Sequence, residues 1–307
     1  MGTDRRWTDE AVLRESERWV HIPQDGMCSE DDRRLLVHLP KRWGTSRVWR
    51  SWAADEGRAS YLIEETIGEV RALGLGMLVL HTGDRVAPPF MDECLARYRF
   101  QTTEKLEVLA YSLVGGREHR LPPVCVPEGV VAELVRDPEG LREALRVDAE
   151  VFRSPPPSDE EFTEYAGEVE KLRRPECGEP PGEGASLALR FADSVIPDPT
   201  HGGDTSHRII GAAGAQVVGG TLRLWGSATR EAFRGRGAYR ALVLERCRVG
   251  THLGATLALT KANIATSASM LKRAGSSEQG SAGSASNAAT CWRSASRRGE
   301  VQACLIG

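Results

Sequence analysis

Features that define several common protein classes are missing from this chain of 307 residues. No apolar run comes near the roughly 20 residues that a membrane-spanning helix needs. The N-terminal segment is polar and charged, and it lacks the apolar core of a signal peptide. We therefore expect a cytoplasmic protein that has no membrane partner.

Cysteine usage argues against two further classes. The 7 cysteines are odd in number, scattered along the chain and never in C-x-x-C spacing. They indicate reduced thiols, not a disulfide framework or a zinc site. His201, Asp204 and His207 are potential metal ligands, but in a glycine-rich segment they more often belong to a strand connection. We predict no metal.

The chain also has little net charge, with 40 Lys and Arg against 43 Asp and Glu, or −3 in total. A protein that binds nucleic acid usually presents a broad basic face, and we expect no nucleic-acid partner here. Basic residues do gather in one region, where the arginines are Arg223, Arg230, Arg234, Arg236, Arg240, Arg246 and Arg248. A local cluster of this kind favours the phosphates of a single ligand.

The most informative segment is the glycine–arginine turn Arg234–Tyr239. It joins an apolar, strand-like run at Thr221–Trp225 to a helix-like run that begins at Tyr239. The first N–H groups of a helix and its dipole both favour an anion. Gly235 and Gly237 would let the main chain approach a phosphate without an intervening side chain. An ordinary surface turn is the alternative.

This turn is neither a Walker loop, since no Lys-Ser/Thr follows, nor G-x-G-x-x-G, since Arg240 takes the last position. It resembles the R-x-x-G-x-G/A signature of the GNAT superfamily of N-acetyltransferases, with Tyr239 where Gly or Ala is usual. The segments that follow strengthen the resemblance. They are Gly254, the apolar strand Thr256–Thr260, Asn263 and a helix that ends at Gly275.

The resemblance implies a mixed α/β fold, the GNAT acyl-CoA N-acyltransferase fold. It implies an enzyme that moves an acetyl group from acetyl-CoA, its co-substrate, to an amine of a small molecule or protein. The loop amides would hold the pyrophosphate, and the preceding strand would carry the pantetheine arm. The implied cofactor-binding residues are Ala228, Thr229, Arg234, Gly235, Arg236, Gly237, Ala238, Tyr239 and Asn263. A role for Asn263 as the N-cap of the last helix is equally compatible with the sequence.

No catalytic residue can be assigned. GNAT enzymes often protonate the leaving thiolate with a tyrosine of the final helix, but Leu271 occupies that place here. Ser267 and Ser269 are weak acids, and Glu231 and Asp193 are more often solvated surface charges than bases. Positioning of the cofactor and amine suffices for reactive amines. The alternative is a catalytically impaired GNAT-like protein that binds acyl-CoA or serves a structural role.

The chain also contains an internal repeat. A helix at Ala59–Leu73 and a strand at Met77–Leu80 correspond to the helix and strand found about 180 residues later. We therefore predict two tandem GNAT-like domains. The first copy has Asp55 and Glu56 in place of the glycine turn, and negative charge there would repel a pyrophosphate. We interpret it as a degenerate, structural domain.

The second copy has its own pattern of elements. We expect helices at Glu139–Phe152 and Ser158–Leu172, the latter with a capping box formed by Ser158 and Glu161. Strands are expected at Val130–Val135, Ser186–Phe191 and Ile209–Val218. In GNAT domains the two early helices form part of the acceptor pocket.

The predicted boundaries are 1–120 for the degenerate domain, 121–127 for a Pro-rich linker, 128–275 for the acetyltransferase domain and 276–307 for the tail. Ser, Ala and Gly make up about half of this tail. Ser281–Ala289 falls where the first copy has the apolar strand Lys105–Leu113. We expect the tail to be disordered and to stay outside the sheet. A sharper hypothesis is that the reading frame was lost after Gly275.

Overall fold

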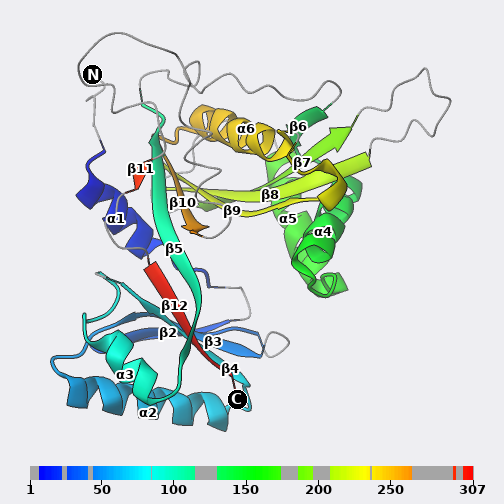
Figure 1. The fold of residues 1–307 in the computed structure, drawn as a ribbon. Coiled ribbons are helices and arrows are strands. Elements are labelled where there is room, and N and C mark those ends of the chain that lie inside the picture. The colour runs from blue at the N-terminus through cyan, green and yellow to red at the C-terminus, as the bar shows by residue number, and fades with distance from the viewer. Residues whose placement is uncertain are drawn as a thin grey trace, which may run out of the picture. The chain divides into compact units, whose positions relative to one another are not determined.

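A computed structural model describes residues 7–22, 26–40, 44–83, 85–114, 130–173, 186–195, 208–235, 237–264, 293–294 and 300–306. These residues form two units, each of which combines strands and helices (Figure 1). The N-terminal unit comprises the described residues within 9–109, 261–264 and 294–306. The C-terminal unit comprises those within 110–260, together with residues 7, 8 and 293.

The N-terminal unit is built on a mixed sheet. Its strands follow the order β1-β2-β3-β4-β12-β5, in which only β3 and β4 are parallel. The elements are α1 (Asp9–Arg18), β1 (Met27–Glu30), β2 (Arg34–His38), β3 (Thr45–Ser51), α2 (Glu56–Ala72), β4 (Met77–Thr82), α3 (Met91–Arg97), β5 (Gln101–Ser112) and β12 (Glu300–Ile306). The predicted helix and strand of the first copy are confirmed as α2 and β4.

Local chemistry explains where the helices of this unit begin and end. Helix α2 starts three residues before the predicted Ala59, because Asp55 caps it by accepting a hydrogen bond from Arg58 N at 2.8 Å. Helix α3 ends at Arg97. Arg99, with φ of 62°, adopts the left-handed conformation that terminates helices.

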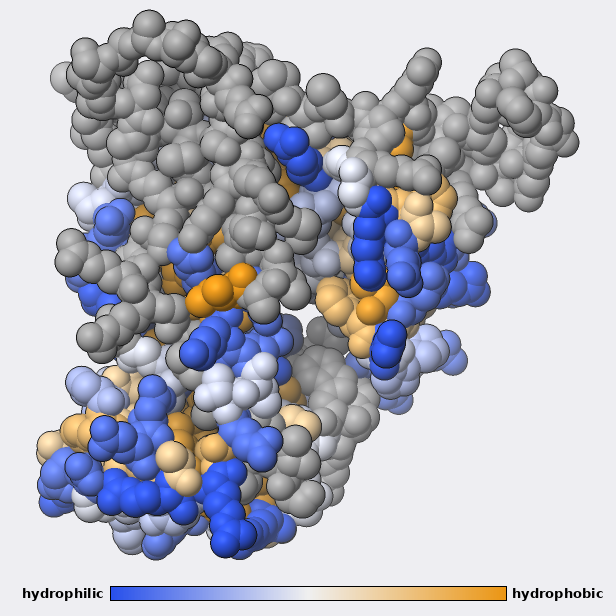
Figure 2. Space-filling model, in the orientation of Figure 1, coloured by the Kyte–Doolittle hydropathy of each residue, from blue (hydrophilic) through white to orange (hydrophobic). Residues whose placement is uncertain are grey.

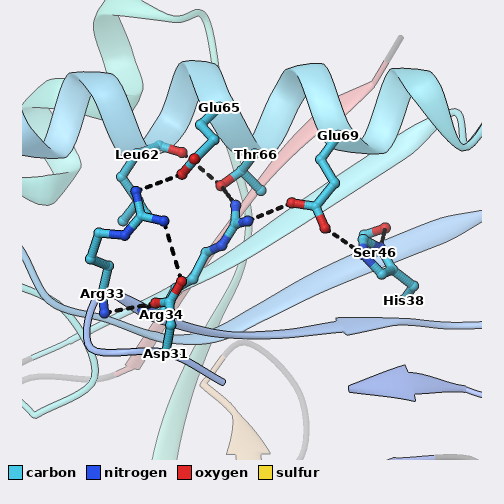
Figure 3. A network of polar contacts seen from close by, with 9 residues as sticks. All are labelled: Asp31, Arg33, Arg34, His38, Ser46, Leu62, Glu65, Thr66 and Glu69. Atoms are coloured by element: carbon cyan, nitrogen blue, oxygen red, sulfur yellow. Dashed lines mark hydrogen bonds and ion pairs between the residues drawn. The ribbon is translucent and has the colours of Figure 1, made fainter. Parts of the chain in front are cut away.

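A buried polar network ties α2 to the sheet (Figure 3). Arg34 of β2 donates to Thr66 and Glu69 of α2. Glu69 Oε1 lies 3.1 Å from His38 Nε2, and His38 Nδ1 lies 2.8 Å from Ser46 Oγ. The serine, histidine and glutamate follow one another as in a hydrolase, but Ser46 has no exposed surface. The network therefore satisfies buried polar groups and offers no nucleophile to a substrate.

Strand β12 corrects an expectation from the sequence. It lies between β4 and β5 and is antiparallel to both, with Val301 opposite Thr82 and Glu300 opposite Leu106. The expectation that nothing after Gly275 enters the sheet is wrong for residues 300–306. Their valine, leucine and isoleucine suit a strand, unlike the Ser/Ala/Gly run that precedes them. The rest of the tail, apart from the two-residue strand β11 (Arg293–Ser294), is outside the described residues.

The C-terminal unit carries a second mixed sheet, ordered β10-β9-β8-β7-β6, in which only β9 and β10 are parallel. Helix α6 covers one face, and α4 and α5 cover the other (Figure 1). The elements are β6 (Val130–Leu134), α4 (Pro138–Phe152), α5 (Asp159–Arg173), β7 (Ser186–Val195), β8 (Arg208–Val218), β9 (Thr221–Thr229), the short 3-10 helix η5 (Glu231–Phe233), α6 (Ala238–His252) and β10 (Leu257–Asn263). All the elements predicted between 130 and 260 are confirmed. The predicted linker and the last predicted helix lie outside the described residues.

Capping fixes the two helices on the second face. Asp137 caps α4 by accepting from Gly140 N at 2.8 Å, and the proline at the start of the helix has the required φ. The predicted capping box of α5 is confirmed. Ser158 N donates to Glu161 Oε2 at 2.8 Å, and Glu161 N donates to Ser158 Oγ at 3.2 Å.

The surface is polar, with hydrophobic residues interspersed. In Figure 2, hydrophilic residues predominate on the visible part of the N-terminal unit. The exposed large hydrophobic residues come from many elements and are Ile22, Met27, Trp52, Tyr61, Val131, Phe152 and Ile264. Scattered apolar residues of this kind are normal on a folded protein. None of the described helices is both long enough and apolar enough to cross a membrane.

Close packing at Gly214 gives a first prediction. A methyl group on this residue of β8 would lie 2.6 Å from the ring of Trp225 on β9. We predict that Gly214→Ala lowers the free energy of unfolding by about 1–3 kcal/mol, because the indole must move. The control is Gly68→Ala in α2, where a methyl group meets nothing within 4 Å and should stabilise the helix by about 0.5–1 kcal/mol. Urea titrations that shift in the same direction for both variants would contradict this account.

Candidate cofactor-binding site

Strand β9 has an edge that β10 covers only in part. The two strands pair from Leu257 opposite Thr221 to Leu259 opposite Arg223. Beyond that register Thr260 Oγ1, a side chain, donates to Leu224 O at 2.9 Å. On its other side β9 stays paired with β8 as far as Thr229. Within the described residues, the second half of β9 therefore presents a strand edge along which an extended ligand with amide groups can pair.

This edge leads to the N-terminus of α6. The chain passes from Thr229 through η5 into a turn where Gly235 has φ of 74° and Gly237 has φ of 90°. Glycine is the residue that adopts such angles without strain. Gly237 is the N-cap of α6 and supplies no capping side chain. No side chain therefore caps the first turn of the helix, and anion binding by its N–H groups stays a prediction.

In the first copy, the N-terminus of the corresponding helix, α2, is capped by a side chain of the same chain. The Asp55 carboxylate takes up a first-turn N–H group of α2. Ser51 N, at the end of β3, donates to Val86 O at 2.7 Å. In the first copy, the helix that corresponds to α6 therefore has a side-chain cap, and Ser51 N at the end of β3 is already bonded. This geometry supports the interpretation of a degenerate domain and gives it a reason beyond the negative charge of Asp55 and Glu56.

Aromatic packing fills the same region of the first copy. Trp49 of β3 stacks on His81 of β4, with ring centroids 4.3 Å apart and an interplanar angle of 10°. Burial, together with the charges of Lys261 and Arg47, holds the pKa of His81 well below its ordinary value. The imidazole is therefore neutral at pH 7 and packs as part of the interior.

Arg230 belongs to the arginine cluster that was expected to favour a phosphate, but its side chain is bound by other residues of the protein. Its Nε donates to Glu150 at 2.9 Å and its Nη2 to Glu143 at 3.2 Å, both on α4. Its Nη1 donates to Ile209 O at 2.6 Å. Arg230 therefore clamps α4 to the strand ends beside the loop, and two carboxylates already balance its charge.

Three more arginines of the cluster point away from a phosphate site. Arg223 and Arg246 are buried, and Arg248 pairs with Glu245 at 2.6 Å. Arg234 and Arg240 remain among the described residues, and Arg236 lies outside them. The exposed Arg234 ties the loop to the end of β9 through a hydrogen bond from its Nε to Thr229 O at 3.1 Å. Arg240 Nε is buried and has no partner among the described residues. The cluster thus contributes fewer cations to the loop than the sequence suggested.

Tyr239 departs from the usual Gly or Ala without blocking the loop. Its half-buried side chain lies beside Ser227 of β9, so it reaches back to the strand. Burial raises the pKa of Tyr239, while the charge of Arg246 and the neighbouring Ser227 act in the opposite direction. The phenol is neutral at pH 7.

Most of the predicted cofactor residues fall in one strand–loop–helix segment. They are Ala228 and Thr229 at the end of β9, Arg234, Gly235 and Gly237 in the turn, and Ala238 and Tyr239 at the start of α6. Thr229 Oγ1 is buried and has no partner in the described part of the chain. Arg236 lies outside the described residues, and Asn263 is the last residue of β10. Their binding roles stay predictions.

The candidates for catalysis gain no support. Glu231 is exposed at the start of η5. The structure does not describe the side chain of Asp193 in β7. Ser267, Ser269 and Leu271 lie outside the described residues. Sequence reasoning missed Ser227 and counted Arg246 with the arginines that favour a phosphate. The isolated glycine at 226 inside a strand pattern was a signal for an irregular strand.

No metal centre can be built from what the structure describes. Among those residues no three His, Cys, Asp or Glu side chains come together as potential ligands. His201, Asp204 and His207 are outside the described ranges.

Comparison with known proteins gives a fold. No family model and no curated protein matches the sequence. A GCN5-related N-acetyltransferase from Sphaerobacter thermophilus matches with a TM-score of 0.60 at 16% identity, over 97% of this chain and 85% of that one. A GCN5-related N-acetyltransferase from Kribbella flavida gives 0.55 at 12% identity, over 97% and 94%. A tandem GNAT protein from the clavulanic acid biosynthesis pathway gives 0.54 at 14% identity, over 97% and 87%.

The fold class predicted from the sequence is therefore confirmed. The chain has a mixed α/β fold of the GNAT type, and its neighbours include a tandem GNAT protein that it matches along almost its whole length. At such low identity the likeness concerns the fold alone. The exact domain boundaries remain predictions.

Proposed function

We propose that the protein is an N-acetyltransferase that moves an acetyl group from acetyl-CoA to an amine of a small molecule or protein. One observation carries the proposal. The uncovered edge of β9 runs directly into the uncapped, glycine-bounded N-terminus of α6. This arrangement suits a long ligand with amide groups along one part and phosphates along another, which is the chemistry of an acyl-CoA.

The residues of the segment fit such a ligand. The β9 edge would pair with the pantetheine amides, and the first N–H groups of α6 would hold the pyrophosphate. Arg234 and Arg240 would add positive charge beside it. Thr229 Oγ1 and Arg240 Nε, both buried and without partners among the described residues, are polar atoms that such a ligand can satisfy.

The transfer needs few further groups. A neutral amine attacks the thioester carbonyl carbon, and the C–S bond breaks as the amide bond forms. The nitrogen loses one proton, and the leaving thiolate takes up one, so that free CoA is released as a thiol. Acetyl-CoA supplies the activated acyl group. The protein contributes chiefly by holding the thioester and the amine in a reactive geometry, an effect that is large for bound reactants. Helices α4 and α5 border the acceptor side in this proposal, and Arg230 keeps α4 in place.

Calorimetry with acetyl-CoA tests the proposal first, followed by a screen of amines with a thiol reagent that detects free CoA. Saturable binding and amine-dependent release of CoA are expected. Absence of acetyl-CoA binding would contradict the proposal. The acceptor, the cytoplasmic location and the absence of nucleic-acid and membrane partners are still predictions from the sequence.

The second candidate is a catalytically impaired protein that binds acyl-CoA or serves a structural role. It is favoured by Leu271, an apolar residue at the place where GNAT enzymes often carry a catalytic tyrosine. The same screen separates the two candidates. An acyl-CoA binder without activity would bind acetyl-CoA and release no CoA with any amine.

The geometry of the two copies predicts one cofactor site per chain. Asp55 caps α2, and Ser51 is bonded to Val86, so the first copy offers no second site. We expect a stoichiometry of about one acetyl-CoA per chain in a calorimetric titration of the full-length protein. Two sites of comparable affinity would overturn the interpretation of the first copy as a degenerate domain.

A further inference from the structure

Arg246, in the middle of α6, is almost completely buried, with 1% of its surface exposed. Its Nε donates to Leu242 O at 3.1 Å, and its Nη2 donates to Ser227 Oγ at 2.9 Å. Its Nη1 donates to Gly214 O at 3.1 Å and to Trp225 O at 3.4 Å. Taking a guanidinium out of water costs several kcal/mol, and a well-packed apolar side chain often stabilises a core at least as well. Stability alone therefore does not explain an arginine here.

The partners of Arg246 surround an irregularity in β9. The ladder between β8 and β9 shifts register between Ala212 and Gly214, and Gly226 has φ of 54°. A bulge of this kind bends a strand and takes backbone groups out of the regular ladder. Arg246 accommodates it by donating to the carbonyl oxygens of Gly214 and Trp225, two residues that are opposite each other on the two strands.

The bulge lies in the half of β9 that β10 leaves uncovered. Ser227 is part of it and accepts a hydrogen bond from Arg246. The side chain of Tyr239, in the first turn of α6, lies beside Ser227. Arg246, Ser227 and Tyr239 thus connect the bent part of β9 with the start of the anion-binding loop.

We propose that Arg246 is a positioning residue that sets the shape of the β9 edge against which the pantetheine arm of acetyl-CoA lies. This role rests on the proposed function. Arg246 acts through the backbone at Trp225 and the side chain of Ser227, and it does not touch the ligand. Its influence falls on the arm and the thioester, because the loop at Gly235–Gly237 holds the phosphates.

Two ligands separate this role from a general effect on folding. Acetyl-CoA uses both the β9 edge and the loop, whereas 3′-phosphoadenosine 5′-diphosphate, the nucleotide half of CoA, uses the loop alone. Arg246→Lys keeps the charge but loses the planar fork that reaches several acceptors. We expect roughly tenfold weaker binding of acetyl-CoA, as from the loss of one or two buried hydrogen bonds. We expect the Kd of the nucleotide to stay within about twofold.

Ser227→Ala is the second variant. It tests the positioning role of Arg246 even if Arg246→Lys does not fold. It removes one acceptor of Arg246 and should weaken acetyl-CoA binding in the same selective way, by about threefold to tenfold. Arg248→Lys is the matched control, because Arg248 lies on the same helix, is exposed and pairs only with Glu245 among the described residues. It should leave both dissociation constants unchanged.

The outcomes are distinct. A selective loss of acetyl-CoA affinity in the two variants supports the positioning role. An equal loss for both ligands, or no loss in a folded variant, overturns it while the proposed function stands. If the unaltered protein binds neither ligand, the proposed function fails and the positioning role fails with it.

Discussion

Gly237→Asp is expected to weaken acetyl-CoA binding by on the order of 100-fold, or about 2.7 kcal/mol. Gly237 is the N-cap of α6 and has φ of 90°, a conformation that strains other residues. An aspartate there places a negative charge where the proposed site holds the pyrophosphate. Two like charges about 4 Å apart near a protein surface repel each other by as much as about 4 kcal/mol. Calorimetry on the two proteins measures the difference.

The control for this variant is Gly219→Asp. Gly219 also has a positive φ, of 53°, but it lies in the turn between β8 and β9, at the opposite end of β9 from the loop. Both substitutions add the same side chain at a strained position, so both should lower the melting temperature slightly. Only Gly237→Asp should lose binding. Equal affinity of the two variants for acetyl-CoA would place the cofactor elsewhere.

Local patterns in the sequence predicted much of the second copy. The strand, glycine turn and helix between Thr221 and His252 could be found because turn glycines and apolar periodicity act over a few residues. The capping box of α5 is likewise local, and both of its hydrogen bonds are present. The start of α2 is also set by a local signal, the cap Asp55. The predicted helix began too late because Asp55 was considered only for its charge.

Features that depend on distant residues could not be predicted in this way. The arginines near the loop look alike in sequence, but Arg230 is bound by Glu143 and Glu150 from a helix about 80 residues earlier. Arg246 is buried because a bulge in β9 offers it acceptors. Charge counted along the sequence therefore overestimated the cations that can face a phosphate.

Strand β12 is the clearest case of this limit. The repeat places the next strand directly after the last helix of the second copy, where the sequence has only Ser, Ala and Gly. The strand at residues 300–306 instead joins the sheet of the N-terminal unit, between β4 and β5. No local pattern identifies a partner that lies about 200 residues away, since strand pairing is decided by the completed sheet.

The second large effect is expected from removing this strand. A chain that ends at residue 299 would leave β4 without the neighbour that it pairs with along its whole length, and β5 without its neighbour over residues 101–106. Each then presents an edge of unpaired backbone groups. We predict a loss of about 3 kcal/mol or more in the stability of the N-terminal unit, because Ala303→Pro alone, in the interior of a central strand, should cost that much. Urea denaturation followed by Trp fluorescence measures it.

Hydrogen exchange locates the effect. Amides of Leu78, Val79 and Leu80 in β4 should exchange much faster in the truncated chain and in Ala303→Pro, since β12 covers that edge of β4. Deletion of Gly307 alone is the control, because it leaves every paired residue of β12 in place, and it should change neither stability nor exchange. If the truncated chain is as stable as the complete one and β4 is equally protected, β12 contributes nothing to the sheet. In that case the whole tail stays outside the sheet, as expected from the sequence.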